Sequence, residues 1–497
     1  MNRHISPLSL AFLFSALFAA AAAQPATTDF KGDAEAVPLS RDHALIYTDT
    51  QNNSSDEPIV LNPGPHLFID RYLISESANV RRVVNSPQRD TAIPNPIITG
   101  KEDHCYQPYM TILRDDSSGR FRMWYGGYVG EGDSYRSCIS YIESADGIRW
   151  DRPARVLDDP APIQFGTCVV DDGPSAPLPA ERFKYAWWKD GGLKIATSPD
   201  GLAWKPMTDA PVLKANHDIT GLFFDPLRKR YVATVSVYRP GDTWAEQRRV
   251  TMHSFSTGLR SWTTPHHVVL PYPSVEPGIV QFYAMDGYLV RGDLLIGMVK
   301  ILRDDLKADN PPDPPDAYGM GYTALAWSRD GETWTRDTTH FFDPDPRQGA
   351  WDHAHAWIDE QVAVGDDVYL YYGGYARGHK VNRYEERQVG LVKIPRDRYV
   401  AWEAGSEPGR IVTPLLTLNG EALSLNAGAD GGSIAVQMLD EDSNPIAGFA
   451  FADNTPITTD ALDAPLAWKR ALTELDGKSL RLEFALTNAR LFAVNLK

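Results

Sequence analysis

Three segments of the chain share one spacing pattern, in which a serine, an Asp-Gly pair and a tryptophan stand at fixed positions. Residues 144–150 read S-x-D-G-x-x-W, and residues 198–204 and 328–334 repeat this pattern. Degenerate copies at 256–262 and 396–402 keep the spacing, and successive tryptophans lie 54, 58, 72 and 68 residues apart. A repeat of this length that is built from strands is typical of a β-propeller. The chain is therefore predicted to be all-β, with a five-bladed propeller.

Each copy of the motif predicts a tight turn between two strands. Glycine accepts a positive φ, and aspartate bonds its own backbone two residues on. The segments between the turns alternate apolar and polar residues, which predicts short strands rather than amphipathic helices. In the first repeat these strands are expected at 109–113, 121–128 and 137–143, and each later repeat offers a similar set.

The pattern changes near residues 405–409, which indicates a second domain. Shorter alternating segments follow at 422–425, 433–439, 447–451, 480–485 and 490–496. Together they predict a small C-terminal β-sandwich. The expected organisation is a signal peptide over 1–23, an irregular segment over 24–64, the propeller over 65–405 and the sandwich over 408–497.

The first residues predict export. Arg3 and His4 precede an apolar run over 8–23 that ends in three alanines before Gln24. Such a run with a small-residue cleavage site is typical of a secretory signal peptide, so the protein is expected to be secreted or periplasmic, and no later segment is long enough to span a bilayer.

Charge and cysteine content restrict the possible partners. The net charge of −16 makes a nucleic acid an improbable partner, because the phosphate backbone is itself negative. The three cysteines are too few for a disulfide framework. A Cys105–Cys138 bridge and three small buried thiols, Cys168 included, remain alternatives.

Acidic residues stand where the innermost strand begins in four of the five repeats. These positions are Asp103-His104, His217-Asp218, Glu276 and Asp352-His353. In a propeller such residues converge at one funnel mouth. Glycosidic cleavage needs one protonated and one ionised carboxyl group, and crowding of like charges separates their pKa values. The alternative is that these acids form Asx turns or solvated loops.

Histidines and aromatic residues gather at the same positions. His353 and His355 alternate, so they lie on one side of a strand, and His379 follows in the next loop. Asp352 together with His353 and His355 does not provide the ligand set and spacing of a zinc site. Sugar binding or proton transfer is expected instead, and structural packing is the alternative. The predicted substrate-binding residues are His104, Tyr106, His217, Trp351, Asp352, His353, His355 and His379.

The turns, the axial acids, the export signal and the C-terminal domain together resemble the five-bladed propeller glycoside hydrolases, the arabinanase, levansucrase and invertase superfamily of families 32, 43, 68 and 117. The resemblance covers about residues 65–405, and the domain at 408–497 looks like the appendage of the invertase branch. It implies that Asp103 is the nucleophile or base, Asp218 the orienting carboxylate and Glu276 the acid.

The sequence departs from that superfamily in three ways. The W-M-N-D-P-N-G opening and the Arg-Asp-Pro motif are absent, so fructan chemistry is not supported. The second aspartate and the glutamate fall one blade later than usual. A branch that resembles the anhydrogalactosidases uses a histidine as the acid, which leaves His353 or His355 as an alternative to Glu276.

The predicted function is a secreted glycoside hydrolase, exo-acting, that degrades a polysaccharide or oligosaccharide. A non-catalytic carbohydrate-binding propeller and a polysaccharide lyase that uses His and Tyr are the alternatives. No cofactor is expected, although a structural calcium ion in the funnel is left open. The sugar, the linkage and the oligomeric state do not follow from the sequence.

Overall fold

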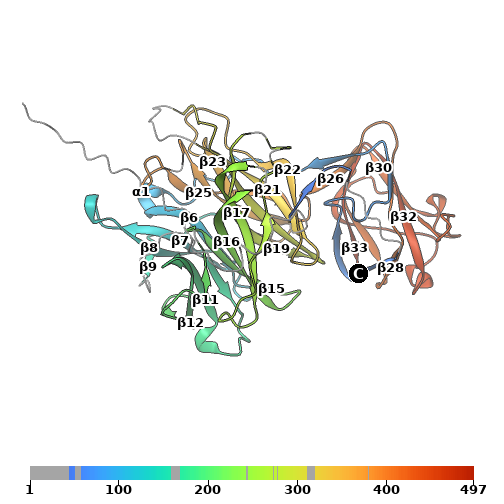
Figure 1. Cartoon of the computed structure of the whole chain (residues 1–497). Coiled ribbons are helices and arrows are strands. Elements are labelled where there is room, and N and C mark those ends of the chain that lie inside the picture. The colour runs from blue at the N-terminus through green and yellow to red at the C-terminus, as the bar shows by residue number, and fades with distance from the viewer. Residues whose placement is uncertain are drawn as a thin grey trace, which may run out of the picture.

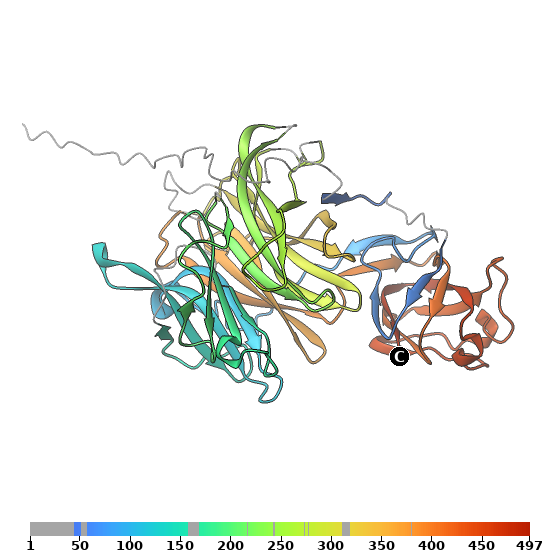
Figure 2. The same cartoon turned by 60° about the horizontal axis from the view of Figure 1, so that its bottom comes forward.

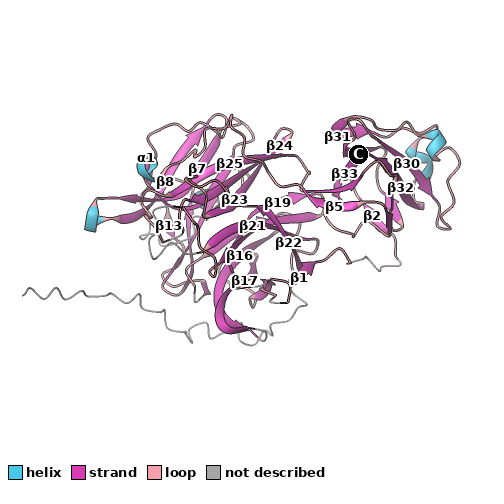
Figure 3. Cartoon of the chain, turned by 90° about the horizontal axis from the view of Figure 1, so that it is seen from above, coloured by secondary structure: helices cyan, strands magenta, loops and turns pink. Residues whose placement is uncertain are grey.

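The computed structural model describes residues 44–50, 57–157, 168–215, 217–241, 244–272, 274–276, 278–310, 319–378 and 380–497. Nearly all of its regular structure is strand, as Figure 3 shows. The helical elements are α1 (Gly100–Asp103) and the 3-10 turns Gly132–Ser134, Pro179–Glu181, Phe451–Asp453 and Leu472–Leu475. The prediction of an all-β chain is confirmed. The predicted signal peptide lies outside the described residues, as does most of the segment 24–64.

Antiparallel meanders follow one another from residue 105 to residue 395. The first is β6 (Cys105–Arg114), β7 (Phe121–Val129), β8 (Arg136–Ser144) and β9 (Arg155–Leu157). The second is β10 (Cys168–Asp171), β11 (Phe183–Lys189), β12 (Gly192–Ser198), β13 (Lys205–Pro206) and β14 (Leu213–Lys214). The third is β15 (Thr220–Asp225), β16 (Arg230–Gly241), β17 (Trp244–Ser256) and β18 (His266–Val269).

Two further meanders share one eight-stranded sheet. The fourth is β19 (Val280–Arg291), β20 (Leu294–Arg303), β21 (Met320–Ser328) and β22 (Trp334–Phe342). The fifth is β23 (His355–Val364), β24 (Asp367–Tyr375) and β25 (Arg387–Pro395). A single pairing of Gly321 with His355 joins them, and β1 (Ala44–Tyr47) pairs in parallel with β22. Bridges from Gln88 to Lys393 and from Ile98 to Val389 extend the fifth meander at its outer edge.

The burial of the inner strands shows that the meanders are covered on both faces. In β20 the nine residues from Leu294 to Leu302 are all buried. A sheet with one solvated face would instead alternate buried and exposed residues. The sheets of neighbouring meanders therefore pack face to face, as Figure 2 shows.

The three complete copies of the motif fold into the same turn. In the first, the Ser144 hydroxyl accepts the Gly147 amide at 2.9 Å, and the Asp146 carboxylate accepts the two amides that follow. Ser198 with Asp200, and Ser328 with Asp330, make the same contacts. The turn geometry predicted from the sequence thus has a hydrogen-bond basis, because serine and aspartate satisfy amides that no strand pairs.

Each of these turns is also fastened to a neighbouring meander. The carbonyl of Gly147 accepts the Tyr371 hydroxyl of the fifth meander at 2.9 Å. The carbonyl of Gly201 accepts the Trp124 indole of the first meander at 2.7 Å. The carbonyl of Gly331 accepts Arg230 of the third at 3.3 Å. The same point on the turn therefore connects neighbouring sheets, and one of these contacts links the fifth meander back to the first.

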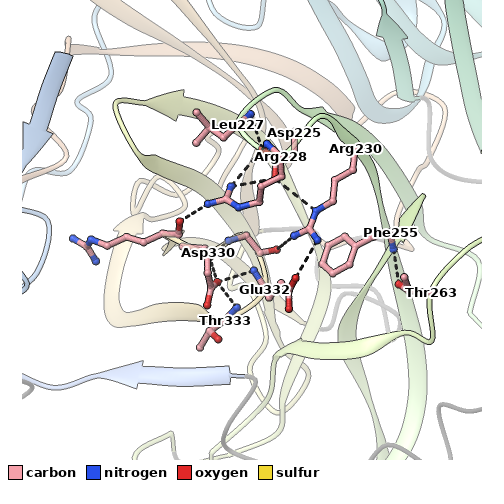
Figure 4. A network of polar contacts seen from close by, with 12 residues as sticks. Asp225, Leu227, Arg228, Arg230, Phe255, Thr263, Asp330, Glu332 and Thr333 are labelled. Carbon is pink, nitrogen blue, oxygen red and sulfur yellow. Dashed lines mark hydrogen bonds and ion pairs between the residues drawn. The ribbon is translucent and has the colours of Figure 1, made fainter. Parts of the chain in front are cut away.

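Charge strengthens the junction between the third and fourth meanders (Figure 4). Buried Asp225 accepts hydrogen bonds from Arg228, which also donates to the Arg329 carbonyl. Arg230 pairs with Glu332 at 3.0 Å and lies over the Phe255 ring at 3.6 Å. These arginines hold the turn of one meander against the side of the next.

A separate unit joins the C-terminal strands to strands near the N-terminus, as the blue and red ribbons of Figure 1 show. One sheet holds β2 (Ile59–Leu61), β4 (Glu76–Ala78), β27 (Gly409–Val412), β28 (Leu416–Leu418), β30 (Ser433–Leu439) and β32 (Ser479–Thr487). The other holds β3 (Gly64–Leu67), β5 (Arg81–Val84), β26 (Val400–Ala404), β29 (Leu423–Gly428), β31 (Asp460–Pro465) and β33 (Ala489–Leu496).

The two sheets of this unit enclose one apolar core. Strand β32 alternates strictly, with Leu480, Leu482, Phe484 and Leu486 buried and their neighbours half-buried. Leu425 and Leu491 of the other sheet belong to the same core. One face of each sheet therefore packs on the other, as alternation in an antiparallel sheet dictates.

The predicted division of the chain did not anticipate the N-terminal strands of this unit. Strands β3 to β5 fall within the residues assigned to the propeller, yet they pair with β33, β27 and β26. These strands are three or four residues long, and GPHL and ESA carry no alternating pattern. The strand predicted at 447–451 is also wrong, because Gly448, at φ +88°, turns the chain before the 3-10 turn Phe451–Asp453.

Replacement of a turn glycine tests the role of the motif in joining the meanders. Gly201 has φ +79°, and an added Cβ would lie 2.9 Å from Trp124. We expect Gly201→Ala to lower the free energy of unfolding by about 2 kcal/mol, because the left-handed backbone and the contact both become strained. Gly258→Ala in the degenerate turn is the control, since no atom lies within 4 Å of its added Cβ. Equal stability of the two variants in urea denaturation would contradict this account.

Candidate functional site

A pocket lies where β6, β15, β19 and β23 begin. Its volume is about 160 Å³, and it holds the predicted residues His217 and Asp218. The residues that line it are Gln107, Tyr109, His217, Asp218, Ile219, Tyr238, Arg249, Tyr283, Trp357, Tyr375, Lys380, Arg383 and Arg387. We call it the cationic pocket, because four of these side chains carry a positive charge and one a carboxyl group.

Aromatic side chains form much of its wall. The rings of Tyr283 and Trp357 lie 4.9 Å apart, and His217 packs edge-on against Tyr238 at 4.8 Å. The indole of Trp357 donates to the Ile301 carbonyl, which fixes the ring. Aromatic faces of this kind suit the apolar faces of a sugar ring.

A chain of polar contacts begins at Asp218 in the pocket lining and ends at Asp304, a carboxyl group that is not among the lining residues. Arg249 is its centre: its Nε donates to His217 Nε2 at 3.0 Å, and its Nη1 donates to Gln281 Oε1 at 2.5 Å. His217 Nε2 lies 3.1 Å from Asp218 Oδ1. At the other end Gln281 Nε2 donates to Asp304 Oδ2. The order is therefore Asp218, His217, Arg249, Gln281, Asp304.

These contacts give the two carboxyl groups different surroundings. His217 Nε2 accepts from Arg249, so it has no proton to donate to Asp218. Gln281 donates an N–H to Asp304, and a donated hydrogen bond favours the ionised form of a carboxyl group. Asp304 therefore receives a hydrogen bond within the chain, whereas Asp218 receives none from His217.

Burial shifts the titration of the groups in this chain. It raises the pKa of Asp218, and the charges of Arg249, Arg383 and Arg387 oppose that rise. Burial also raises the pKa of Asp304, against the charges of Arg249 and Lys380. For His217, burial and the neighbouring Arg249 both lower the pKa well below its usual value, so this imidazole is neutral.

The other predicted acids lie elsewhere, in ion pairs. Asp103 accepts both nitrogens of the Arg152 fork at 2.7 and 2.9 Å, and its side chain is 1% exposed. Glu276 makes two 2.7 Å bonds to buried Arg336. Asp352 bonds to Arg89 and to the Tyr372 hydroxyl. Of the four predicted axial acids, Asp218 alone lines the cationic pocket.

The predicted binding residues other than His217 also lie outside the lining of this pocket. His104 stacks on Tyr128, and Tyr106 stacks on Tyr384. Trp351 packs against Tyr372, and His353 bonds to Asp309 and to the Asp345 carbonyl. His355 is fully buried between Trp357 and Tyr375, where burial lowers its pKa to about 3. His379 lies outside the described residues.

Several residues of the contact chain carry no signal in the sequence. Arg249 and Gln281 stand inside β17 and β19, and Asp304 is the first residue after β20. The predicted acids stand at strand starts, whereas Asp304 follows the end of a neighbouring strand. Lys380, Arg383 and Arg387 form a basic stretch, but nothing in it points to Asp218.

A second, larger cavity of about 300 Å³ lies next to the first and shares Tyr109 and Ile219 with it. Asp286, Asp359 and Glu360 line it. Beside them Lys300, 1% exposed, forms ion pairs with Asp286 at 2.8 Å and with Asp359. Asp359 also accepts the Met110 amide at 2.5 Å. We call Lys300 and these three acids the axial ion cluster. It connects strands of the first, fourth and fifth meanders.

Metal ligands and disulfides are not features of the described residues. No group of three or more His, Cys, Asp or Glu side chains suited to a metal occurs in this part of the chain. Cys105, Cys138 and Cys168 are free thiols, and the first two are buried. In the same described residues no helix is long and apolar enough to cross a membrane.

Comparison with known proteins gave matches among solved structures, while no family model and no curated protein matches the chain. A glycosyl hydrolase from Bacteroides ovatus is 14% identical over 64% of this chain and 96% of that one, with a TM-score of 0.40. A structure from the GH130 family of mannoside phosphorylases, which contains glycoside hydrolases that target β-1,2 mannosidic linkages in Candida mannan, is 15% identical over 63% and 95%, with a TM-score of 0.39.

A GH32 β-fructofuranosidase from Bombyx mori is 10% identical over 81% of this chain and 94% of that one, with a TM-score of 0.39. Each of these three structures is a glycoside hydrolase or belongs to a family that contains glycoside hydrolases. At these TM-scores they do not bear on the reaction, which is argued below from the side chains.

The axial ion cluster predicts a pH-dependent stability. Burial raises the pKa of Glu360 from 4.5 to about 8, and the charge of Asp286 adds to the rise. The folded state therefore holds this proton more tightly than the unfolded state. Glu360 stabilises the fold fully below its unfolded pKa, and that contribution declines as the pH rises through the folded value.

Glu360→Gln should remove this decline. Between about pH 5 and pH 9 the wild-type chain should lose up to about 4 kcal/mol more unfolding free energy than the variant. Urea denaturation across this range measures the difference, with Glu407→Gln at an exposed position as the control. A variant whose stability falls as steeply as that of the wild type would rule out Glu360 as the source.

Proposed function

We propose that the protein is a glycoside hydrolase whose active site is the cationic pocket. The observation that carries this proposal is the contact chain that ends in Asp218 on one side and Asp304 on the other. Hydrolysis of a glycosidic bond by the common route requires a pair of carboxyl groups, one of which holds a proton. The aromatic wall supplies the faces on which a sugar ring can lie.

In this proposal Asp218 is the general acid. Burial raises its pKa, and His217 Nε2, 3.1 Å away, has no proton to donate to it because it accepts from Arg249. A carboxyl group that stays protonated near neutral pH can donate its proton to the leaving oxygen. His217 is a positioning residue, since Arg249 fixes its tautomer.

Asp304 is the second carboxyl group. Gln281 donates to it, and Gln281 is itself oriented by Arg249, so its amide nitrogen faces the carboxylate. An ionised Asp304 can attack the anomeric carbon or activate a water molecule. The roles that the resemblance implied for Asp103 and Glu276 are not carried into this proposal, because both groups are bound by an arginine fork.

The architecture that we propose around this site is a five-bladed propeller with an appended β-sandwich. The contacts to Gly147, Gly201 and Gly331 support a closed ring, since each turn is bound by the neighbouring meander. The common apolar core of β32 and β33 supports the sandwich. In such a ring the starts of β6, β15, β19 and β23 meet at one mouth.

Exo-action and export complete the proposal. A pocket of about 160 Å³ has room for about one sugar residue, which suits a chain end rather than the middle of a chain. The apolar run over residues 8–23 supports secretion or a periplasmic location.

A lyase is the second candidate, because Arg249 lies beside His217 in a positively charged pocket, as neutralisation of a uronate requires. The residue that would act as the base in a lyase reaction is harder to assign in this pocket. His217 Nε2 already accepts from Arg249, and burial raises the pKa of Tyr238 and of Tyr283 above the usual tyrosine value. The products distinguish the two: a lyase leaves an unsaturated sugar that absorbs ultraviolet light, and a hydrolase does not.

Removal of either carboxyl group should stop hydrolysis. Asp218→Asn and Asp304→Asn should each lower kcat/KM by about a thousandfold, because each deletes one of the two acid–base groups. Sugar release from a panel of plant and algal polysaccharides, followed by chromatography, measures the loss. Asp209→Asn at an exposed position is the control and should keep full activity.

For the ion-paired acids Glu276 and Asp103 we expect no loss of kcat/KM. Glu276→Gln leaves Arg336 buried without its counter-ion, so it should lower the melting temperature while the folded protein keeps its kcat/KM. If Glu276→Gln and Asp103→Asn abolish sugar release while Asp218→Asn and Asp304→Asn do not, the active site lies elsewhere. Sugar bound by the wild-type chain and never cleaved would favour a binding protein.

A further inference from the structure

We infer that the cationic pocket binds an anionic saccharide, one that carries a carboxylate or a sulfate ester. This inference rests on the proposed function, since it names the substrate class of the same site. Its basis is a contrast in charge: the chain has a net charge of −16, yet this small pocket gathers Arg249, Lys380, Arg383 and Arg387 against a single lining carboxyl group, Asp218.

Arginines elsewhere in the chain show what a structural role looks like. Arg336 is 3% exposed and binds Glu276 through both nitrogens of its fork. Arg82 is 7% exposed and lies 2.6 Å from Asp337. A buried cation is costly unless a carboxylate offsets it, and these pairs are the usual solution.

Arg249 is arranged differently. Its hydrogen-bond partners include the neutral groups His217, Gln281 and Tyr238, and its guanidinium lies over the rings of Tyr238 at 4.9 Å and Tyr283 at 4.4 Å. Among the described residues no carboxylate lies within ion-pair distance of it. The surrounding side chains therefore hold the guanidinium in place and leave its charge for a ligand.

Arg383 adds a second cation from the loop between β24 and β25. It is half-buried, and among the described residues it too forms no ion pair within 4 Å. Its charge lowers the pKa of Asp218, and the charge of Lys380 lowers the pKa of Asp304, in both cases against the effect of burial. Each carboxyl group thus has a cation near it. A saccharide anion bound between Arg383 and Lys380 would have positive charge on two sides, while its ring lies on Tyr283 and Trp357.

Hydrolysis of a neutral sugar requires none of this charge. The two carboxyl groups would be positioned equally well by neutral donors such as Gln281. A substrate that brings its own negative charge explains the excess, because arginine forks match the geometry of carboxylate and sulfate oxygens. The volume of the pocket limits the anion to the sugar residue that enters it.

Calorimetry on the full-length Asp218→Asn variant tests the inference without cleavage. The probes are oligosaccharides that end in a uronate, their carboxyl-reduced counterparts, sulfated oligosaccharides and inorganic phosphate. The uronate or the sulfated probe should bind at least tenfold more tightly than the neutral counterpart, and higher salt should weaken that binding. The stronger of the two identifies the anion.

Charge variants locate the anion in the pocket. Added to the Asp218→Asn chain, Arg383→Gln should weaken binding of the anionic probe about tenfold and leave the neutral probe unaffected. Arg249→Gln should weaken binding of the anionic probe about tenfold more than binding of the neutral probe. Arg249→Lys keeps the charge and should recover part of the loss. Arg155→Gln, an exposed position on β9, removes the same charge elsewhere and should change nothing. Melting temperatures confirm that each variant is folded.

Two results would overturn the inference, and each leaves the proposed hydrolase testable by itself. Equal affinity for the anionic and the neutral probe would show that the pocket does not recognise the charge of the saccharide, even if the wild-type chain cleaves neutral sugars. Inorganic phosphate that binds and displaces the uronate without discrimination would show an ion site rather than a saccharide site. Tight uronate binding without cleavage by the wild-type chain would keep the inference and reject the hydrolase.

Discussion

The burial of Lys300 between the meanders is the constraint on which the arrangement of their strands depends. An ammonium group that is 1% exposed requires counter-ions, and Asp286 of β19 and Asp359 of β23 supply them. Asp359 also binds the Met110 amide of β6, so one buried charge fixes strands of three meanders. Lys300 further lies under the Tyr109 ring at 4.4 Å, and Tyr109 separates the two cavities.

This arrangement explains why the two cavities differ in charge. The larger one contains the acids that Lys300 requires, and they are engaged in holding the strands together. The cationic pocket beyond Tyr109 has positive charge in excess, and its one lining carboxyl group, Asp218, is connected through Arg249 to Asp304. The axial ion cluster therefore serves the structure, whereas we propose that the contact chain serves the chemistry.

The sequence predicted the parts of this molecule that depend on local chemistry. The Ser-x-Asp-Gly turns follow from hydrogen bonds within a few residues, and β30 begins and ends where the alternation places it. Short strands such as β3 and β4 escaped detection, because their pairing depends on partners more than 300 residues away. Of the predicted site residues that the structure describes, only His217 and Asp218 line the proposed pocket. Asp304 and Arg249 approach from other meanders, and no local pattern marks such an approach.

A crystal structure of the Asp218→Asn variant with an uncleaved oligosaccharide would show where the substrate binds. We expect the sugar to lie against Tyr283 and Trp357, with its glycosidic oxygen at position 218 and its anomeric carbon facing Asp304. A sugar bound in the larger cavity beside the axial ion cluster, or with its glycosidic bond at Asp103 or Glu276, would contradict this expectation.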